Sequence, residues 1–489
     1  MKPLSRRNAL ALGVTGTAAV AAGAAGLHWS RTAGLSTGGG AALKEPVTLA
    51  SRQGRLAVRL EAAPARIGIG GRTASVAAFN GSLPGPTLRL DPGDRLNITL
   101  VNALADPTNL HVHGLHVSPA GNGDNPFISV APGQSYEYEF VLPPDHPPGT
   151  FWYHPHHHGM AAEQVAAGLY GAIIVPDPAP IPVSRERVLI VSDISLDGNG
   201  QIEQVSLPER MMGREGRTVL VNGQVRPALQ AAPGERERWR LINACPARYL
   251  NLQLEGPRYQ LLALDGRLLS TVSDTGQLLL APGNRADVLV TPGEGRWTLR
   301  TDRYDRGGMA GMMMGGGTSA GTPSGLLSFD ARGDPVPEPG PVPEPGPVPR
   351  LPVLRDLREE PVTGRRRLDF SMGTGQGMGP AAMGFTINGK EFDAGRVDET
   401  VSVGSVEEWT LSNSSPMDHP VHLHVWPMQI IQEGARDLTG PQWQDVVNIP
   451  ANSEVKVLVA FDSFPGRTVF HCHILDHEDL GMMGVVEAR

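Results

Sequence analysis

Residues 471–483, HCHILDHEDLGMM, place a cysteine directly between two histidines near the end of the chain. Thiol, imidazole and thioether side chains are ligands that soft and borderline transition metals accept. Along a β-strand, residues two apart point to the same face, so His471 and His473 would share one face and Cys472 would occupy the other. The segment therefore predicts two neighbouring metal sites that share one strand.

His-x-His pairs occur far more often than chance allows. Fifteen histidines in 489 residues would give roughly half of one such pair at random. The chain has five, at 111/113, 154/156, 156/158, 422/424 and 471/473. On strands, each pair offers two imidazoles to one metal region. The eight histidines of four pairs are too many for one ion and suit a cluster of two or three.

The opposite face of the Cys472 strand predicts a different site. His419, His477 and Met482 are available to join Cys472 there. Two histidines, one thiolate and a weak thioether make the trigonal site of a blue copper centre. His419 differs in parity from His422 and His424, as a ligand for a second site should. Cys245 is the only other cysteine; a disulfide with Cys472 stays an alternative, and a small buried hydrophobe is the simpler interpretation.

A threefold repeat positions these motifs. Asn-Gly, a gap and an alternating strand closed by asparagine occur at 79–102, 221–243 and 387–413, and a second shared piece begins at Gly149, Gly295 and Gly466. Short strands with frequent turn signals predict an all-β chain of three β-sandwiches. The provisional limits are 45–176, 177–332 and 351–489. The cluster would lie where the first and third units meet.

Two further segments lie outside these units. Residues 1–30 contain paired arginines before a small apolar run, which predicts a twin-arginine export signal, with a membrane anchor as the weaker alternative. We therefore expect an exported, periplasmic or extracellular protein without stable membrane insertion. Residues 333–350 repeat PVPEPG and predict an extended polyproline tether, favoured over a recognition motif. A net charge of −8 argues against nucleic acid as a partner.

The segments LHVHG, WYHPHHHG, HPVHLH and HCHILDHEDLGMM together resemble, in order and spacing, the four copper-binding motifs of the multicopper oxidases. The resemblance covers nearly the whole chain after the leader, and is closest to bacterial three-domain laccases and cuprous oxidases. It implies three cupredoxin domains and four copper ions: one type 1, one type 2 and two type 3. The type 1 ligands it implies are His419, Cys472, His477 and Met482. The type 2 ligands are His111 and His422, and the type 3 ligands are His113, His154, His156, His424, His471 and His473.

The resemblance also implies an activity. One-electron oxidation of phenolic or metal donors, including Cu(I), would be coupled to four-electron reduction of O2 to water. A laccase-like enzyme with a role in copper tolerance is expected, acting as a monomer. A dedicated cuprous oxidase with weak phenol oxidase activity is one alternative. A non-catalytic copper-binding electron-transfer protein is another, although it would not need the eight cluster histidines.

Acidic and methionine side chains near these motifs suggest further roles. Asp124 and Glu478 are carboxylates placed where proton relay to the cluster is plausible. Thioethers prefer Cu(I), so methionines in glycine-rich segments predict a copper-collecting surface. Met417 and Asp418, just before His419, would pass an electron inward from a bound cuprous ion. The glycine-rich segments hold Met309, Met312, Met313 and Met314, and then Met372, Met378 and Met383.

Overall fold

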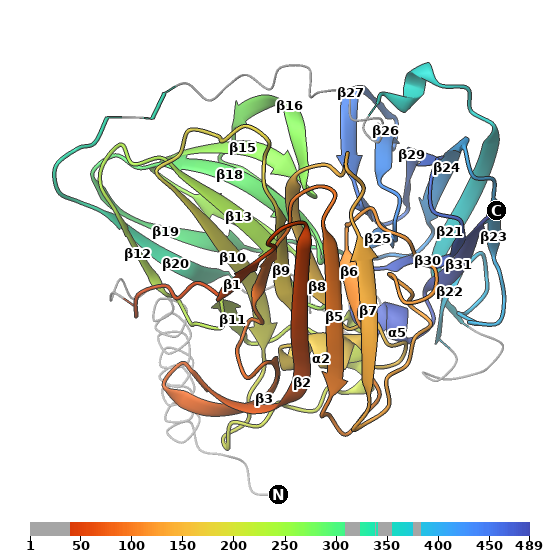
Figure 1. Cartoon of the computed structure of the whole chain (residues 1–489), viewed down its shortest axis with the longest axis horizontal. Coiled ribbons are helices and arrows are strands. Elements are labelled where there is room, and N and C mark those ends of the chain that lie inside the picture. The colour runs from red at the N-terminus through yellow and green to blue at the C-terminus, as the bar shows by residue number, and fades with distance from the viewer. Residues whose placement is uncertain (1–39, 309–322, 338, 341–354, 375–382) are drawn as a thin grey trace, which may run out of the picture. The chain divides into compact units, whose positions relative to one another are not determined.

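The computed structural model describes residues 40–308, 323–337, 339–340, 355–374 and 383–489 (Figure 1). The predicted export signal, Met309, Met312, Met313, Met314, Met378 and much of the proline-rich segment lie outside these residues, and so does the side chain of Met383. Among the helices that the structure describes, none is long and apolar enough to cross a membrane. Strands dominate, and the all-β prediction is confirmed.

The described strands form six sheets, two in each third of the chain, which is consistent with three cupredoxin domains. The first sandwich pairs sheet β1-β4-β9-β8-β6 with sheet β3-β2-β5-β7. Its strands are β1 (Thr48–Ala50), β2 (Arg55–Ile69), β3 (Arg72–Phe79), β4 (Thr87–Arg89), β5 (Arg95–Asn102), β6 (His111–His113), β7 (Ser135–Val141), β8 (Gly149–His154) and β9 (Gly171–Val175).

The middle sandwich pairs sheet β11-β10-β13-β18-β15-β16 with sheet β12-β20-β19-β14-β17. Its strands are β10 (Arg185–Ile194), β11 (Thr218–Val221), β12 (Ala228–Ala231), β13 (Glu237–Asn243), β14 (Leu250–Leu254), β15 (Arg258–Leu264), β16 (Arg267–Asp274), β17 (Gln277–Leu280), β18 (Arg285–Thr291), β19 (Gly295–Asp302) and β20 (Ser324–Ala331).

The third sandwich pairs sheet β22-β21-β24-β29-β26-β27 with sheet β23-β31-β30-β25-β28. Its strands are β21 (Gly364–Thr374), β22 (Met383–Ile387), β23 (Glu399–Val401), β24 (Ser405–Asn413), β25 (His419–Leu423), β26 (Met428–Glu433), β27 (Arg436–Gln444), β28 (Val446–Ile449), β29 (Ser453–Phe461), β30 (Gly466–Cys472) and β31 (Met483–Ala488). The described residues also form short helices: α2 (Ala161–Ala167), α3 (Leu207–Met212), η2 (Leu357–Glu359) and α5 (Leu475–Asp479).

The sequence repeat reappears as a repeated set of hydrogen bonds. Asn102, Asn243 and Asn413 close equivalent strands, and each accepts a backbone N–H from the residue two positions later. Each also donates to backbone carbonyls of the following loop and turn. Buried amides need such partners, so one asparagine holds together the loop beyond each strand. The domain limits themselves stay predictions, because residues 41–489 form a single compact unit.

Two ladders position the metal-binding motifs. In the first sandwich β6 pairs with β8, so His111 lies opposite His154. In the third sandwich β25 pairs with β30, so His422 lies opposite His471 and Val421 lies opposite Cys472. These strands are buried along their lengths, except for the first two residues of β30, which are half-buried. Side chains on both of their faces must therefore pack against protein.

Candidate metal centre

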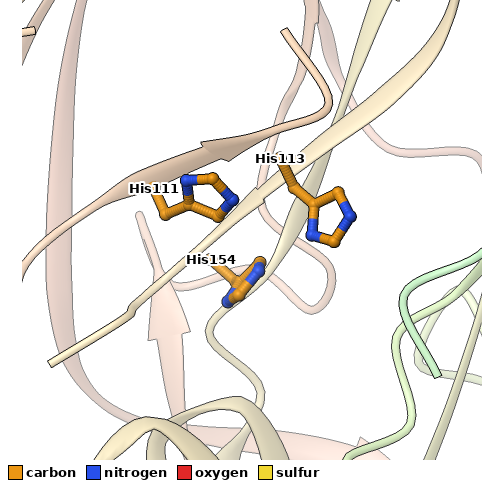
Figure 2. Close-up of side chains that lie close together, drawn as sticks. All are labelled: His111, His113 and His154. Carbon is orange, nitrogen blue, oxygen red and sulfur yellow. The ribbon is translucent and has the colours of Figure 1, made fainter. Parts of the chain in front are cut away.

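Eight histidines from the first and third sandwiches gather into one buried cluster. His111 and His113 project from β6 toward His154 at the end of β8 (Figure 2). Nε2 of His111 lies 3.3 Å from Nε2 of His422. Nε2 of His471 lies 3.0 Å from Nε2 of His156 and 3.3 Å from Nε2 of His424. The cluster therefore lies where the first and third sandwiches meet, as the sequence predicts.

In three of the cluster histidines, the ring nitrogen that points away from the cluster faces an oxygen acceptor. His422 Nδ1 donates to the Asp445 carbonyl at 2.7 Å, and His154 Nδ1 donates to the Pro155 carbonyl at 2.9 Å. His111 Nδ1 lies 2.8 Å from Asp124 Oδ1. Since a neutral imidazole carries one proton, these bonds leave the inward Nε2 atoms with lone pairs. Such outer hydrogen bonds commonly orient metal-binding histidines.

The cluster histidines are suited to binding metal ions, because their ring nitrogens face one another without protons between them. Burial lowers the pKa of His111, His113, His154, His422, His424 and His473 well below 6.5, and that of His156 and His471 to about 4, so the rings are neutral. Lone pairs about 3 Å apart repel unless a cation lies near both. Both nitrogens of His473, and Nε2 of His154, lack a hydrogen-bond partner among the described residues. This donor set is buried and consists of imidazole nitrogens, some of which have no hydrogen-bond partner among the described residues, so it suits copper.

A second set of donors lies on the other face of β30. Cys472 Sγ lies 3.4 Å from His419 Nδ1 and 3.8 Å from His477 Nδ1. Met482 is fully buried in the same apolar core as Cys472, and its carbonyl accepts the Cys472 N–H at 3.1 Å. Burial raises the pKa of the Cys472 thiol, so a soft cation would be needed to keep it ionised. The side-chain alternation therefore separates two donor sets, as predicted.

Neither cysteine forms a disulfide: Cys245 and Cys472 are both free. Cys245 is buried in the apolar core of the middle sandwich, with its Sγ 3.8 Å from the Val191 carbonyl. The interpretation of Cys245 as a small buried hydrophobe agrees with this position.

The middle sandwich covers the Cys472 site, which the sequence reasoning missed. His477 Nε2 donates to the Met211 carbonyl of α3 at 3.1 Å, and its ring stacks on Phe385. Asp476 binds the guanidinium of Arg214 at 2.8 Å, which holds the residues after α3 in place. The capping box Ser206-Leu-Pro-Glu209 signals a helix start in sequence. It carries no sign of where the helix docks.

The two predicted relay carboxylates both lie at the cluster. Asp124 accepts from the backbone N–H of Val112 at 3.1 Å as well as facing His111. Glu478 Oε2 lies 3.1 Å from His471 Nδ1, but that nitrogen is also 3.1 Å from the Cys472 carbonyl, to which its proton is directed. The Glu478 oxygens consequently have no hydrogen bond within the described part of the chain. Burial raises the pKa of Glu478 to about 7.

Met417 and Asp418 lie beside the Cys472 site in different surroundings. Met417 is buried in the same core as Cys472. The Asp418 carboxylate accepts hydrogen bonds from the Tyr304 hydroxyl at 2.7 Å and from the Ala451 N–H at 2.9 Å. It is therefore tied to neighbouring backbone and side chains. Met372 on β21 is half-buried against the same core.

Similarity to known proteins agrees with this arrangement. Residues 62–180, 190–314 and 362–489 each match a multicopper oxidase family. The solved structure of a multicopper oxidase from Campylobacter jejuni, described as a metallo-oxidase, is 31% identical with a TM-score of 0.78, covering 92% of this chain and 95% of that one. The multicopper oxidase MmcO of Mycobacterium tuberculosis is 28% identical, covering 98% of this chain and 95% of its own. A multicopper oxidase of Staphylococcus aureus is 27% identical over 85% of each chain. This chain belongs to the multicopper oxidase family.

Proposed function

We propose that this multicopper oxidase uses Cu(I) as its preferred electron donor and O2 as its acceptor, and oxidises phenols more slowly. Four Cu(I) ions would each lose one electron, and O2 would take up four electrons and four protons to give two waters. The observation that carries the proposal is the covered edge of His477.

The cover matters because a phenol must approach the electron-accepting site closely. His477 is fully buried, and its outer nitrogen is occupied by the Met211 carbonyl. An aromatic ring cannot lie against this edge without displacing α3. A small metal ion could instead bind on the outer side of the cover and transfer its electron through it. The cover thus favours small donors over bulky ones.

Methionines converge at this cover. A Cβ on Gly308 would overlap the Met212 methyl group and would lie 3.5 Å from that of Met417. Gly308 immediately precedes Met309, the first methionine of the glycine-rich segment. Thioethers from α3, from Met417 and from the segment that begins after Gly308 could therefore serve one soft ion such as Cu(I). The description of the Campylobacter relative as a metallo-oxidase supports the same donor class.

Copper is the cofactor that we propose for both donor sets. When bound, four coppers would supply one-electron acceptance at one site and four-electron reduction of O2 at the other. We assign one type 1 copper to His419, Cys472, His477 and Met482. The type 2 and type 3 ions are assigned to the eight cluster histidines as the motifs imply. The chain's own task at the cluster is to hold the inward nitrogens free of protons.

Asp124 and Glu478 are the residues that we propose for proton supply. Both carboxylates are buried beside cluster histidines. A raised pKa of about 7 lets Glu478 carry a proton near neutral pH and release it as a general acid. Asp124 would hold the proton on His111 Nδ1 and so keep its Nε2 free. Export, monomeric state and a role in copper tolerance belong to the same proposal and rest on the sequence alone.

Oxygen uptake with two donors tests the choice of donor. The parent protein and a variant with Met309, Met312, Met313 and Met314 changed to serine would be assayed with Cu(I) and with a phenol. We expect the Cu(I) rate to fall about tenfold and the phenol rate to stay unchanged. Met160→Ser, near the first-sandwich helix α2, is the control and should alter neither. Equal losses with both donors, or a parent protein faster with phenol than with Cu(I), would refute the donor assignment.

A further inference from the structure

A buried ion pair joins the middle sandwich to the third one beside the histidine cluster. Arg285, the first residue of β18, is fully buried. Its two terminal nitrogens each donate to one oxygen of Asp445 at 2.6 Å. Asp445 lies between β27 and β28. A bidentate arginine–carboxylate pair fixes both position and orientation of the carboxylate.

Asp445 in turn contacts histidines from both outer sandwiches. Its Oδ1 lies 3.0 Å from His113 Nε2, and its backbone carbonyl accepts the His422 Nδ1 proton at 2.7 Å. With Nε2 donating to Asp445, the lone pair of His113 is on Nδ1, which has no hydrogen-bond partner among the described residues. One residue therefore sets the ring tautomer of two cluster histidines that come from different sandwiches.

A second carboxylate of the middle sandwich holds the Asp445 backbone. Asp265 accepts from the backbone N–H groups of Asp445 and Val446 at 3.2 Å each, and from the Arg285 N–H at 2.8 Å. It also accepts from the Asn284 side chain at 2.9 Å. The side chain and the backbone of Asp445 are consequently both held from the middle sandwich. This leaves the residue little freedom to shift.

Two glycines show how closely the three sandwiches approach one another. A Cβ on Gly114, next to His113, would overlap both Arg285 Nη2 and Asp445 Oδ2. A Cβ on Gly283, two residues before Arg285, would lie 3.0 Å from the ring atoms of His473. Both residues have positive φ, 86° and 87°, which glycine adopts without strain. All three sandwiches thus meet around the Arg285–Asp445 pair.

We propose that Arg285 and Asp445 are positioning residues for the copper cluster, through which the middle sandwich fixes ligands that it does not itself supply. The inference rests on the copper-ligand assignment proposed above. Removing the bidentate contact from the Arg285 guanidinium frees Asp445 to move. His113 and His422 then lose their fixed tautomer and ring orientation. Such outer partners typically change metal affinity by about 10- to 100-fold.

The test compares copper binding with folding stability in matched variants. Arg285→Lys keeps the charge but loses the fork, Asp445→Asn keeps the shape but loses the charge, and Arg285→Met removes the pair. The control is Arg187→Met, because Arg187 makes a buried bidentate pair with Glu237 of the middle sandwich. Neither control residue contacts a cluster histidine among the described residues. Copper affinity by competition with a chelator, the type 2 EPR signal and the unfolding midpoint would be measured on each purified full-length protein.

We expect Arg285→Lys and Asp445→Asn to weaken cluster copper binding about 10- to 100-fold and to alter the type 2 signal, while the blue type 1 absorption stays. Arg187→Met should lower the unfolding midpoint and leave the type 2 signal unchanged. If Arg285→Met does not fold, the lysine and asparagine variants carry the test. Parent-like copper affinity and EPR spectrum in both would overturn the inference and leave the pair a purely structural contact. A parent protein without cluster copper would instead refute the ligand assignment.

Discussion

The two faces of β30 bear donor sets in opposite surroundings. His471 and His473 face a cluster bordered by the carboxylates Asp124, Asp445 and Glu478. Cys472 faces His419, His477 and Met482 within an apolar core. At the cluster face the carboxylates lie against histidine ring nitrogens. Beside the cysteine face, the Asp418 carboxylate is instead bound to Tyr304 and Ala451. Adjacent residues of one strand therefore meet environments suited to proton-coupled oxygen reduction and to electron acceptance, respectively.

The two faces also differ in what the middle sandwich contributes. At the cluster it fixes Asp445 through Arg285 and Asp265. At the cysteine site it covers His477 with the Met211 carbonyl. Among the residues that the structure describes, the middle sandwich supplies no member of the grouped histidine and cysteine donors. It acts on each site through the residues around the ligands.

The largest expected effect is a loss of stability of the copper-free protein in acid. Burial lowers the pKa of the histidines on both faces below 6.5, so each group stabilises the fold above pH 6.5 and that stability is lost as pH falls toward its folded pKa. The slope from each ring approaches about 1.4 kcal/mol per pH unit once the pH is well below 6.5. Urea unfolding between pH 6.5 and 5 measures this slope.

Double variants sharpen that result for each face. His113→Gln with His473→Gln, and His419→Gln with His477→Gln, should each remove up to about 2.7 kcal/mol per pH unit from the slope. Equal reductions are expected because both pairs are equally buried. A parent slope near zero in this range would contradict burial of neutral rings on either face.

Glu478→Gln should lower the turnover of O2 by about 100-fold or more, because the amide cannot supply a proton. Reduction of the type 1 site by Cu(I) in the absence of oxygen, measured as the loss of blue absorption, should keep the parent rate. The neighbouring acid gives the control: Asp479→Asn removes a carboxylate that binds the backbone N–H groups of Gly159, Ala161 and Ala162 instead of a histidine. Parent-like turnover in Glu478→Gln would remove its proposed role.

Asp124→Asn should have a smaller effect, about tenfold on turnover, because the amide still reaches His111 but no longer holds its Nδ1 proton as a charged acceptor. The measurement is steady-state oxygen uptake with Cu(I), together with the type 2 EPR signal. Unchanged oxygen turnover would rule out a role for Asp124 at the cluster face.

The smallest effect is expected at the cover of the cysteine face. Arg214→Gln breaks the ion pair with Asp476 and should loosen the residues after α3, raising the phenol rate a few-fold relative to the Cu(I) rate. Arg217→Gln is the matched control, because its pair with Glu203 is exposed and exposed pairs contribute little. No change in the ratio of the two rates for Arg214→Gln would argue that the cover does not select the donor.

The local parts of this arrangement are predictable from sequence. The period of two along a strand separates His471 and His473 from Cys472 without knowledge of the fold. The threefold asparagine pattern predicts three related β-sandwiches. Both inferences depend on residues within a few positions of one another or on repetition.

Arg285, Asp445 and α3 could not be found in the same way. Asp445 in WQDVV and Arg285 in PGNRAD resemble ordinary strand and turn residues. Their pairing joins positions 160 residues apart and depends on how two sandwiches pack. Likewise, the sequence signals the start of α3, but its contact with His477 spans 266 positions. Packing between sandwiches is not encoded in any short window of the chain.

Copper content and colour of the parent protein and of Cys472→Ser test the division of β30 into two sites most directly. The account predicts four coppers and blue absorption in the parent. In Cys472→Ser it predicts three coppers, no blue absorption and an unchanged type 2 EPR signal. Cys245→Ser, a buried free cysteine of the middle sandwich, should keep all four coppers and the colour. One or two coppers without oxygen uptake in the parent, or loss of the cluster coppers together with the blue colour in Cys472→Ser, would contradict the account.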